Sequence, residues 1–127
     1  MENQVPKVAD LKGRTFRYSL SVIKLTDTLL IDTATQIIIR QLLRSATSIG
    51  ANVSEAQAAS SRKDFTNFIS HSLKSANESI YWLSLLKESG KVNSANFEVI
   101  LNETKELARI LGASAATLRN KRKVNPV

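Results

Sequence analysis

The chain has 127 residues, of which 43% are hydrophobic and 23% charged, and it carries a formal net charge of +7. These are the proportions of one globular domain and not of a disordered chain. Because it has no cysteine and His71 is its one histidine, it cannot form a disulfide or a thiolate or multi-histidine metal site, and we expect no metal and no cofactor. The polar N-terminus and the lack of an apolar run of about 18 residues predict a cytoplasmic protein without membrane contact.

The positions of the helix breakers predict an all-α protein. Both prolines, Pro6 and Pro126, lie outside residues 10–122, so this long region contains no residue that interrupts a helix as strongly as proline does. The one β-branched run, residues 37–39, lies inside a helical pattern of apolar positions.

The first two predicted helices have distinct apolar repeats. The first spans about residues 12–30, and its repeat at steps of three and four residues runs through Phe16, Leu20, Ile23, Asp27 and Leu30. The second begins at Thr33, which is placed to cap its own helix together with Gln36 in a Thr-x-x-Gln capping box. Its apolar positions form a seam like that of a coiled coil, at Ile39, Leu42, Ala46, Ile49, Val53 and Ala56.

The third and fourth predicted helices fill the rest of the region. The third begins at a second capping box, Ser61 with Asp64, and stops at Gly90. Its expected buried positions are Phe65, Phe68, Ile69, Leu73, Ala76, Ile80, Leu83 and Leu86. The fourth begins near Asn93, and its apolar positions are Phe97, Ile100, Leu101, Leu107, Ile110, Leu111, Ala115 and Leu118.

The short connections between these helices predict the topology. Connections of two to five residues make consecutive helices antiparallel neighbours, which gives an up-down-up-down four-helix bundle. We assign residues 12–118 to the bundle, residues 1–11 to a flexible N-terminal segment and residues 119–127 to a basic C-terminal tail.

Two helices carry more small or apolar surface than one bundle core requires. Ser45 and Gly50 belong to a run of small residues, which is typical of a helix that another backbone approaches closely. Tyr81 and Trp82 widen the apolar face of the third helix. We expect these four residues in an interface between copies of the chain, so that the bundle forms a homo-oligomer. A monomer with an unusually broad core is the alternative.

Positive charge gathers near the start and at the end of the sequence. No acidic residue follows Glu106, whereas the C-terminal segment carries four cations. Clusters of this kind bind polyphosphates by releasing counterions, with little reading of base sequence. The residues that we expect to contact nucleic acid are Arg14, Arg17, Arg40, Arg119, Lys121, Arg122 and Lys123. The alternative for the C-terminal group is a solvated helix end whose cations offset the helix dipole.

A polar stripe follows the second helix at steps of four, four and three residues. Its members are Arg44, Ser48, Asn52 and Glu55. We interpret the stripe as structural, with Arg44 and Glu55 paired to polar residues of the third helix such as Glu78 or Tyr81, because an unpaired buried charge is costly. A binding groove is the alternative.

The sequence offers little support for catalysis. Glu55 and Glu78 could act as an acid–base pair only if they faced each other, and neither a glycine-rich phosphate loop nor a nucleophile elbow accompanies them. We interpret His71 as a surface or interface residue and the Tyr81–Trp82 pair as packing residues rather than a base-stacking platform. We therefore expect no enzymatic activity.

The string QLLRSATSIGAN at residues 41–52, followed by Glu55 and Ala56, resembles a bacterial family of four-helix-bundle proteins. The first members of that family were found encoded in intervening sequences of 23S ribosomal RNA genes. Residues 12–20, 61–65 and 78–83 match further parts of its pattern, so the resemblance covers about residues 10–118. It implies a four-helix protomer that assembles as a ring-shaped homopentamer with no assigned enzymatic activity.

The same family is similar in fold to the accessory protein of diversity-generating retroelements, a basic pentamer that binds nucleic acid and a reverse transcriptase. The residues and the resemblance together predict a non-enzymatic homo-oligomer that binds RNA or DNA through basic surfaces. The alternative is a scaffold that docks a reverse transcriptase or another protein of a mobile element.

Overall fold

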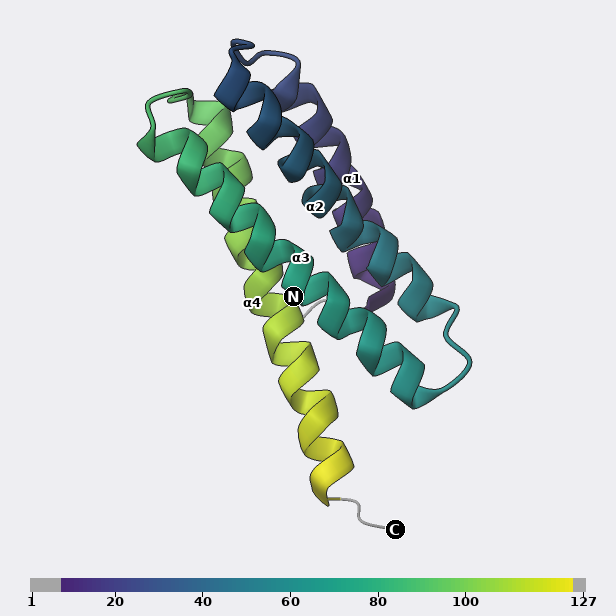
Figure 1. Cartoon of the computed structure of the whole chain (residues 1–127). Coiled ribbons are helices and arrows are strands. Elements are labelled where there is room, and N and C mark those ends of the chain that lie inside the picture. Colours follow the sequence, from purple (N-terminus) through teal and green to yellow (C-terminus); the bar gives the residue numbers. More distant parts are fainter. Residues whose placement is uncertain (1–7, 125–127) are drawn as a thin grey trace, which may run out of the picture.

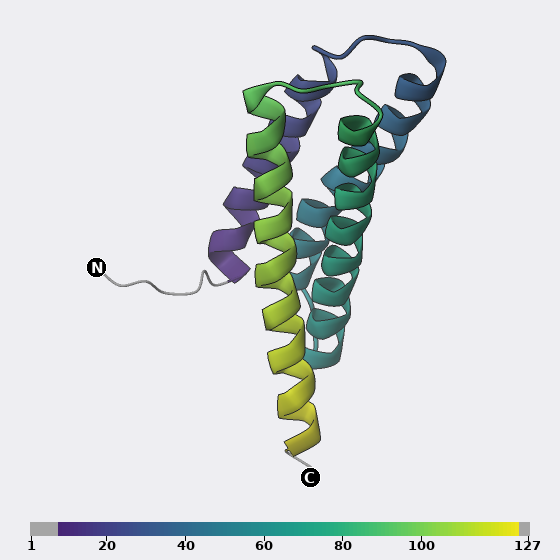
Figure 2. The ribbon, with the colours of Figure 1, turned by 90° about the vertical axis from the view of Figure 1, so that its left-hand side faces the viewer.

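The computed structural model describes the backbone of residues 8–124 and the side chains of residues 10–120, and the described chain is entirely helical apart from short loops (Figure 1). Its helices are α1 at Val8–Thr26, α2 at Thr33–Gln57, α3 at Arg62–Glu88 and α4 at Ala95–Val124. The predicted all-α class is confirmed, and the described residues form four helices and no strand. Figures 1 and 2 show that the C-terminal turns of α4 extend beyond the other helices.

The helix ends follow side-chain chemistry that is partly visible in the sequence. Ser61 caps α3 as predicted, because its Oγ accepts a hydrogen bond of 3.1 Å from the Asp64 amide. The predicted cap of α2 at Thr33 is wrong. Asp32 caps this helix instead, and its carboxylate accepts from the Thr35 amide at 2.8 Å. A carboxylate at this position complements the positive end of the helix dipole, which a threonine hydroxyl does only weakly.

The end of α3 depends on a glycine in the left-handed region. Gly90 has a φ of +76°, a conformation that a side chain disfavours. The turn is closed by two hydrogen bonds of 3.1 Å, from the Lys91 amide to the Leu86 carbonyl and from the Gly90 amide to the Lys87 carbonyl. This is a Schellman motif, and it confirms Gly90 as the stop of the third helix.

The core contains the apolar seam predicted for α2 in full and nearly all of that predicted for α4. The face predicted for α1 is wrong. Its buried residues are Leu11, Thr15, Tyr18, Val22 and Leu25. The expected repeat through Phe16, Leu20 and Ile23 lies on the opposite side of the helix and is exposed. The core accepts Thr15 and Tyr18 because the Thr15 hydroxyl donates to the Leu11 carbonyl and the Tyr18 hydroxyl bonds to Thr104.

Small hydroxyl residues form the contact between α2 and α3. The Ser72 hydroxyl donates to the Ile49 carbonyl at 2.8 Å, and the hydroxyls of Ser45 and Ser79 lie 2.8 Å apart. Side chains of this size let the two backbones approach closely. Four of the residues expected to be buried on α3, Phe65, Phe68, Leu73 and Ile80, are only half-buried.

Candidate nucleic-acid interface

The net charge of the described chain lies in one half of the bundle. We define the basic half as residues 8–17, 46–57, 62–75 and 110–124, which lie toward the same end of the bundle in Figures 1 and 2. Its ten cationic residues are Lys12, Arg14, Arg17, Arg62, Lys63, Lys74, Arg119, Lys121, Arg122 and Lys123. Its three acidic residues are Asp10, Glu55 and Asp64.

The remainder of the described chain is neutral. Its seven cationic residues are Lys24, Arg40, Arg44, Lys87, Lys91, Lys105 and Arg109. Its seven acidic residues are Asp27, Asp32, Glu78, Glu88, Glu98, Glu103 and Glu106. We call this part the neutral half. An excess of unbalanced cations at one end of a molecule attracts polyanions to that end.

Ion pairing increases the contrast between the two halves. Four ion pairs lie within the neutral half, namely Arg44–Glu78, Lys87–Glu98, Lys91–Asp32 and Arg109–Glu106. Among the described side chains of the basic half, Arg14 is the one cation in an ion pair, and its partner Glu103 belongs to the neutral half. Six exposed cations of the basic half therefore have no ion-pair partner in the described structure: Lys12, Arg17, Arg62, Lys63, Lys74 and Arg119.

The basic C-terminal segment continues α4. The helix runs to Val124, so residues 119–124 of the expected tail have a helical backbone, whereas residues 125–127 lie outside the described structure. The side chains of Lys121, Arg122 and Lys123 also lie outside it. The N-terminal segment likewise becomes helical from Val8.

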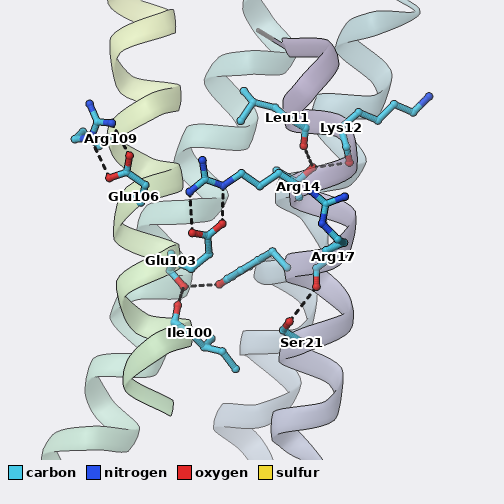
Figure 3. A network of polar contacts seen from close by, with 12 residues as sticks. Leu11, Lys12, Arg14, Arg17, Ser21, Ile100, Glu103, Glu106 and Arg109 are labelled. Carbon is cyan, nitrogen blue, oxygen red and sulfur yellow. Dashed lines mark hydrogen bonds and ion pairs between the residues drawn. The ribbon is translucent and has the colours of Figure 1, made fainter. Parts of the chain in front are cut away.

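The predicted contact Arg14 is half-buried and forms an ion pair with Glu103 between α1 and α4 (Figure 3). Its Nε and Nη2 donate to the two carboxylate oxygens of Glu103 at 2.7 and 2.8 Å, and both side chains are less than a third exposed. The hydrogen bond to Glu103 raises the pKa of Arg14. A phosphate would have to break this bidentate pair, so Arg14 is better explained as a link between α1 and α4.

The other predicted contacts differ in their surroundings. Arg17 is exposed, and its guanidinium lies over Gly13, where a Cβ would come within 3.2 Å of Nη1. Arg40 is exposed but belongs to the neutral half. Arg119 is exposed and begins the basic end of α4.

The polar stripe of α2 lies along its contact with α3. Arg44 donates to Glu78 at 2.6 Å, as expected, but the Arg44 side chain is exposed and the pair lies at the surface. Glu55 is exposed and has no side-chain partner within the described structure, so the expected pairing of Glu55 is wrong.

Glu55 and Glu78 do not face each other. Arg44 pairs with Glu78, and Ser48 pairs with Ser75, so increasing residue numbers on α2 meet decreasing numbers on α3. In this register Glu55 lies opposite about residue 68, roughly ten residues or 15 Å from Glu78. The two carboxylates are too far apart to act as an acid–base pair.

The residues predicted for an oligomer interface mostly serve contacts within the protomer. Ser45 is buried against Ser79. Gly50 allows the approach of α1, because a Cβ there would lie 3.1 Å from the Thr15 hydroxyl. Trp82 is half-buried and donates to Glu78 at 3.0 Å, whereas Tyr81 is 57% exposed and meets Trp82 edge-on. The side chain of Ser45 is therefore not available to a second copy.

The apolar repeat of α1 that was predicted to be buried forms an exposed stripe instead. Phe16, Leu20 and Ile23 are 65%, 43% and 43% exposed and lie on the side of α1 opposite its core face. Beside them a hollow of about 550 Å³ opens between α1 and α2, with Phe16 on its wall and Gly50 and Ala51 among its lining residues. The sequence also contains the repeat that is buried, through Leu11, Tyr18, Val22 and Leu25, and its spacing is equally helical.

The described part of the chain offers no cluster of three metal-binding side chains. Within the same region no helix is both long enough and apolar enough to cross a bilayer.

Comparisons with known proteins identify the family of this chain. The family described as 23S rRNA-intervening sequence protein matches residues 10–113. The chain belongs to this family. It is also similar to the crystal structure of a protein of unknown function from the S23 ribosomal protein family of Bacteroides thetaiotaomicron, with 33% identity and a TM-score of 0.79 over 87% of this chain and 99% of that one. No functionally curated protein matches the chain. The resemblance read from residues 41–56 is therefore confirmed.

Proposed function

We propose that this chain is a non-enzymatic homo-oligomer that binds RNA or DNA through its basic half. The observation that carries the proposal is the location of the charge: ten cationic and three acidic residues share the basic half, and six of the cations are exposed without an ion-pair partner in the described structure. Free cations of this kind release counterions from a phosphate backbone without reading its bases.

The proposed contacts lie toward the basic end of the bundle. They are Lys12, Arg17, Arg62, Lys63, Arg119, Lys121, Arg122 and Lys123. Arg14 is left out because Glu103 holds it, and Arg40 is left out because it lies in the neutral half. The helical extension of α4 would present its cations on a backbone that is already ordered. Binding would therefore cost less conformational entropy than it would for a flexible tail.

The exposed apolar face of α1 supports an oligomer. The stripe of Phe16, Leu20 and Ile23 and the hollow beside it lie on the same region of the surface. An exposed apolar stripe beside a hollow suits contact with a second copy of the chain. The stripe of that copy would cover apolar surface that is otherwise exposed to solvent. Several copies would join their basic halves, so that weak phosphate contacts act together.

A matched pair of triple variants tests the nucleic-acid proposal. In the first, Arg119→Ala, Lys121→Ala and Arg122→Ala remove three charges from the basic half. In the second, Lys24→Ala, Arg40→Ala and Lys105→Ala remove three charges of the neutral half that have no ion-pair partner among the described residues. Binding of a labelled single-stranded RNA and a labelled DNA duplex is measured by fluorescence anisotropy at low salt.

We expect the first variant to lose more than about tenfold in affinity and the second to stay within about twofold of the unaltered protein. Equal losses in both variants would show that total charge and not its location governs binding, against the proposal. An absence of binding by the unaltered protein would favour the scaffold alternative.

A further inference from the structure

A polar groove between α2 and α3 is not used by the proposed nucleic-acid contacts. It has a volume of about 420 Å³, and its lining includes Arg44, Ser48 and Asn52 from α2 and His71, Lys74 and Ser75 from α3. It contains three of the four residues of the polar stripe on α2, to which the proposed function assigns no role. A groove of this size is larger than an isolated ion requires and lies within the range of small-molecule sites.

One lining residue of the groove, Ser48, has a hydroxyl with an uncommitted proton. Ser48 Oγ accepts hydrogen bonds from Asn52 Nδ2 at 3.0 Å and from Ser75 Oγ at 3.1 Å. These two bonds occupy both acceptor positions of the hydroxyl. Because the described structure gives the Ser48 proton no acceptor, it is left for a ligand oxygen.

The one carboxylate that lines the groove is already neutralised. Glu78 Oε2 accepts from Arg44 Nη2 at 2.6 Å and from Trp82 Nε1 at 3.0 Å. Lys74 is exposed and has no ion-pair partner in the described structure, so Arg44, Lys74 and Glu78 together give the lining a surplus of one positive charge.

Hydrogen-bond donors therefore outnumber acceptors in the groove. The Lys74 ammonium, an N–H of the His71 ring, the Ser48 hydroxyl and the uncommitted N–H groups of Arg44 can all donate. A phosphoryl group, with an excess of negative charge and several acceptor oxygens, is the common biological ligand that matches such a surplus.

We propose that this groove binds the phosphoryl group of a nucleotide, with Lys74 and Ser48 on its oxygens and the remaining volume open to the sugar and base. The phosphoryl group belongs either to a free mononucleotide or to the 5′ end of a strand. The site uses one protomer. Lys74 belongs to the basic half, but it is not among the strand contacts proposed above, so the site does not depend on the proposed function.

Nitrogen-15 NMR titrations of the full chain test the site. The probes are inorganic phosphate, adenosine 5′-monophosphate, adenosine, and a short oligonucleotide with or without a 5′ phosphate. We expect saturable amide shifts at Ser48 and residues 71–75 with the phosphate-bearing probes and none with adenosine.

The variant Lys74→Ala is expected to weaken adenosine 5′-monophosphate binding by about tenfold, since one charge-assisted hydrogen bond is lost. Lys105→Ala removes the same charge from an exposed position on α4 that forms no ion pair within the described structure, and it should leave the affinity unchanged. Ser48→Ala should weaken binding by a smaller factor, because a neutral donor is removed.

Equal effects of Lys74→Ala and Lys105→Ala, or shifts that never saturate, would overturn the proposal. Binding of the 5′-phosphorylated oligonucleotide without binding of the mononucleotide would support the site and assign its phosphate to a strand end. The triple variant of Arg119, Lys121 and Arg122 should still bind the mononucleotide. Loss of strand affinity and loss of groove binding are thus separate results.

Discussion

Tyr18 and Thr104 form a buried polar contact between α1 and α4. Thr104 Oγ1 donates to the Ile100 carbonyl at 2.7 Å, so its proton is committed. The Tyr18 hydroxyl therefore donates to Thr104, and their oxygen atoms lie 2.6 Å apart. Burial is the main cause that raises the pKa of Tyr18 from 10.0 to about 12.

The variant Tyr18→Phe tests this contact. At neutral pH we expect it to lower the free energy of unfolding by about 1 kcal/mol, the usual contribution of one internal hydrogen bond. Its effect should change at high pH. Between pH 10 and 12 the unfolded chain ionises this tyrosine while the folded chain keeps it protonated, so the unaltered protein loses stability over that interval.

Phenylalanine cannot ionise, and the variant should therefore lose less stability than the unaltered protein as pH rises above 10. Thermal unfolding followed by circular dichroism at neutral and alkaline pH measures both effects. Parallel declines of the two proteins above pH 10 would contradict the burial of the Tyr18 hydroxyl.

At the scale of the helices, packing depends on how closely two helix backbones approach each other. Gly50 lies where α2 meets α1, and a Cβ there would be 3.1 Å from the Thr15 hydroxyl and 3.3 Å from its carbonyl carbon. Gly112 of α4 has more room, because a Cβ there would lie 3.8 Å from the nearest atom of Leu73. The two glycines should respond to substitution in opposite directions.

We expect Gly50→Leu to lower the free energy of unfolding by about 1–3 kcal/mol, since α1 must move away from α2. Gly112→Ala should raise it by up to about 1 kcal/mol, because alanine favours the helix and fits the space. Chemical denaturation of both variants measures the difference. An unchanged stability for Gly50→Leu would contradict the close approach of α1 and α2.

The limits of prediction from sequence are clearest in the helix faces. The buried face of α2 could be predicted because its sequence has one continuous apolar repeat at helical spacing. On α1 two repeats lie on opposite sides, and the one through Phe16, Leu20 and Ile23 is exposed. The core uses Thr15 and Tyr18 instead, since their hydroxyls find partners only after folding.

The candidate site shows the same limit. The basic end of α4 could be predicted from composition, because it depends on residues that are close in sequence. The pairing of Arg14 could not, since Glu103 is 89 positions away and its position depends on the packing of α1 against α4. The division of charge between the two halves could not be predicted from composition either, because the fold determines which ends of the four helices lie together.

At the scale of the whole molecule, the exposed stripe on α1 predicts that the protein is an oligomer in solution. Light scattering coupled to size exclusion should give a mass that is a multiple of 14.0 kDa. The double variant Phe16→Glu and Leu20→Glu should shift the protein toward a single copy without unfolding it, because both positions are exposed within the protomer. A mass of one copy for the unaltered protein would contradict the oligomer.

The most direct test of the account is the salt dependence of nucleic-acid binding. The logarithm of the association constant for single-stranded RNA should fall linearly with the logarithm of the salt concentration, because counterions are released. The slope should be smaller by about 2 in the variant with Arg119, Lys121 and Arg122 replaced by alanine, and unchanged in the variant with Lys24, Arg40 and Lys105 replaced. Binding that is insensitive to salt, or equal slopes in both variants, would contradict the claim that the basic half holds the phosphate backbone.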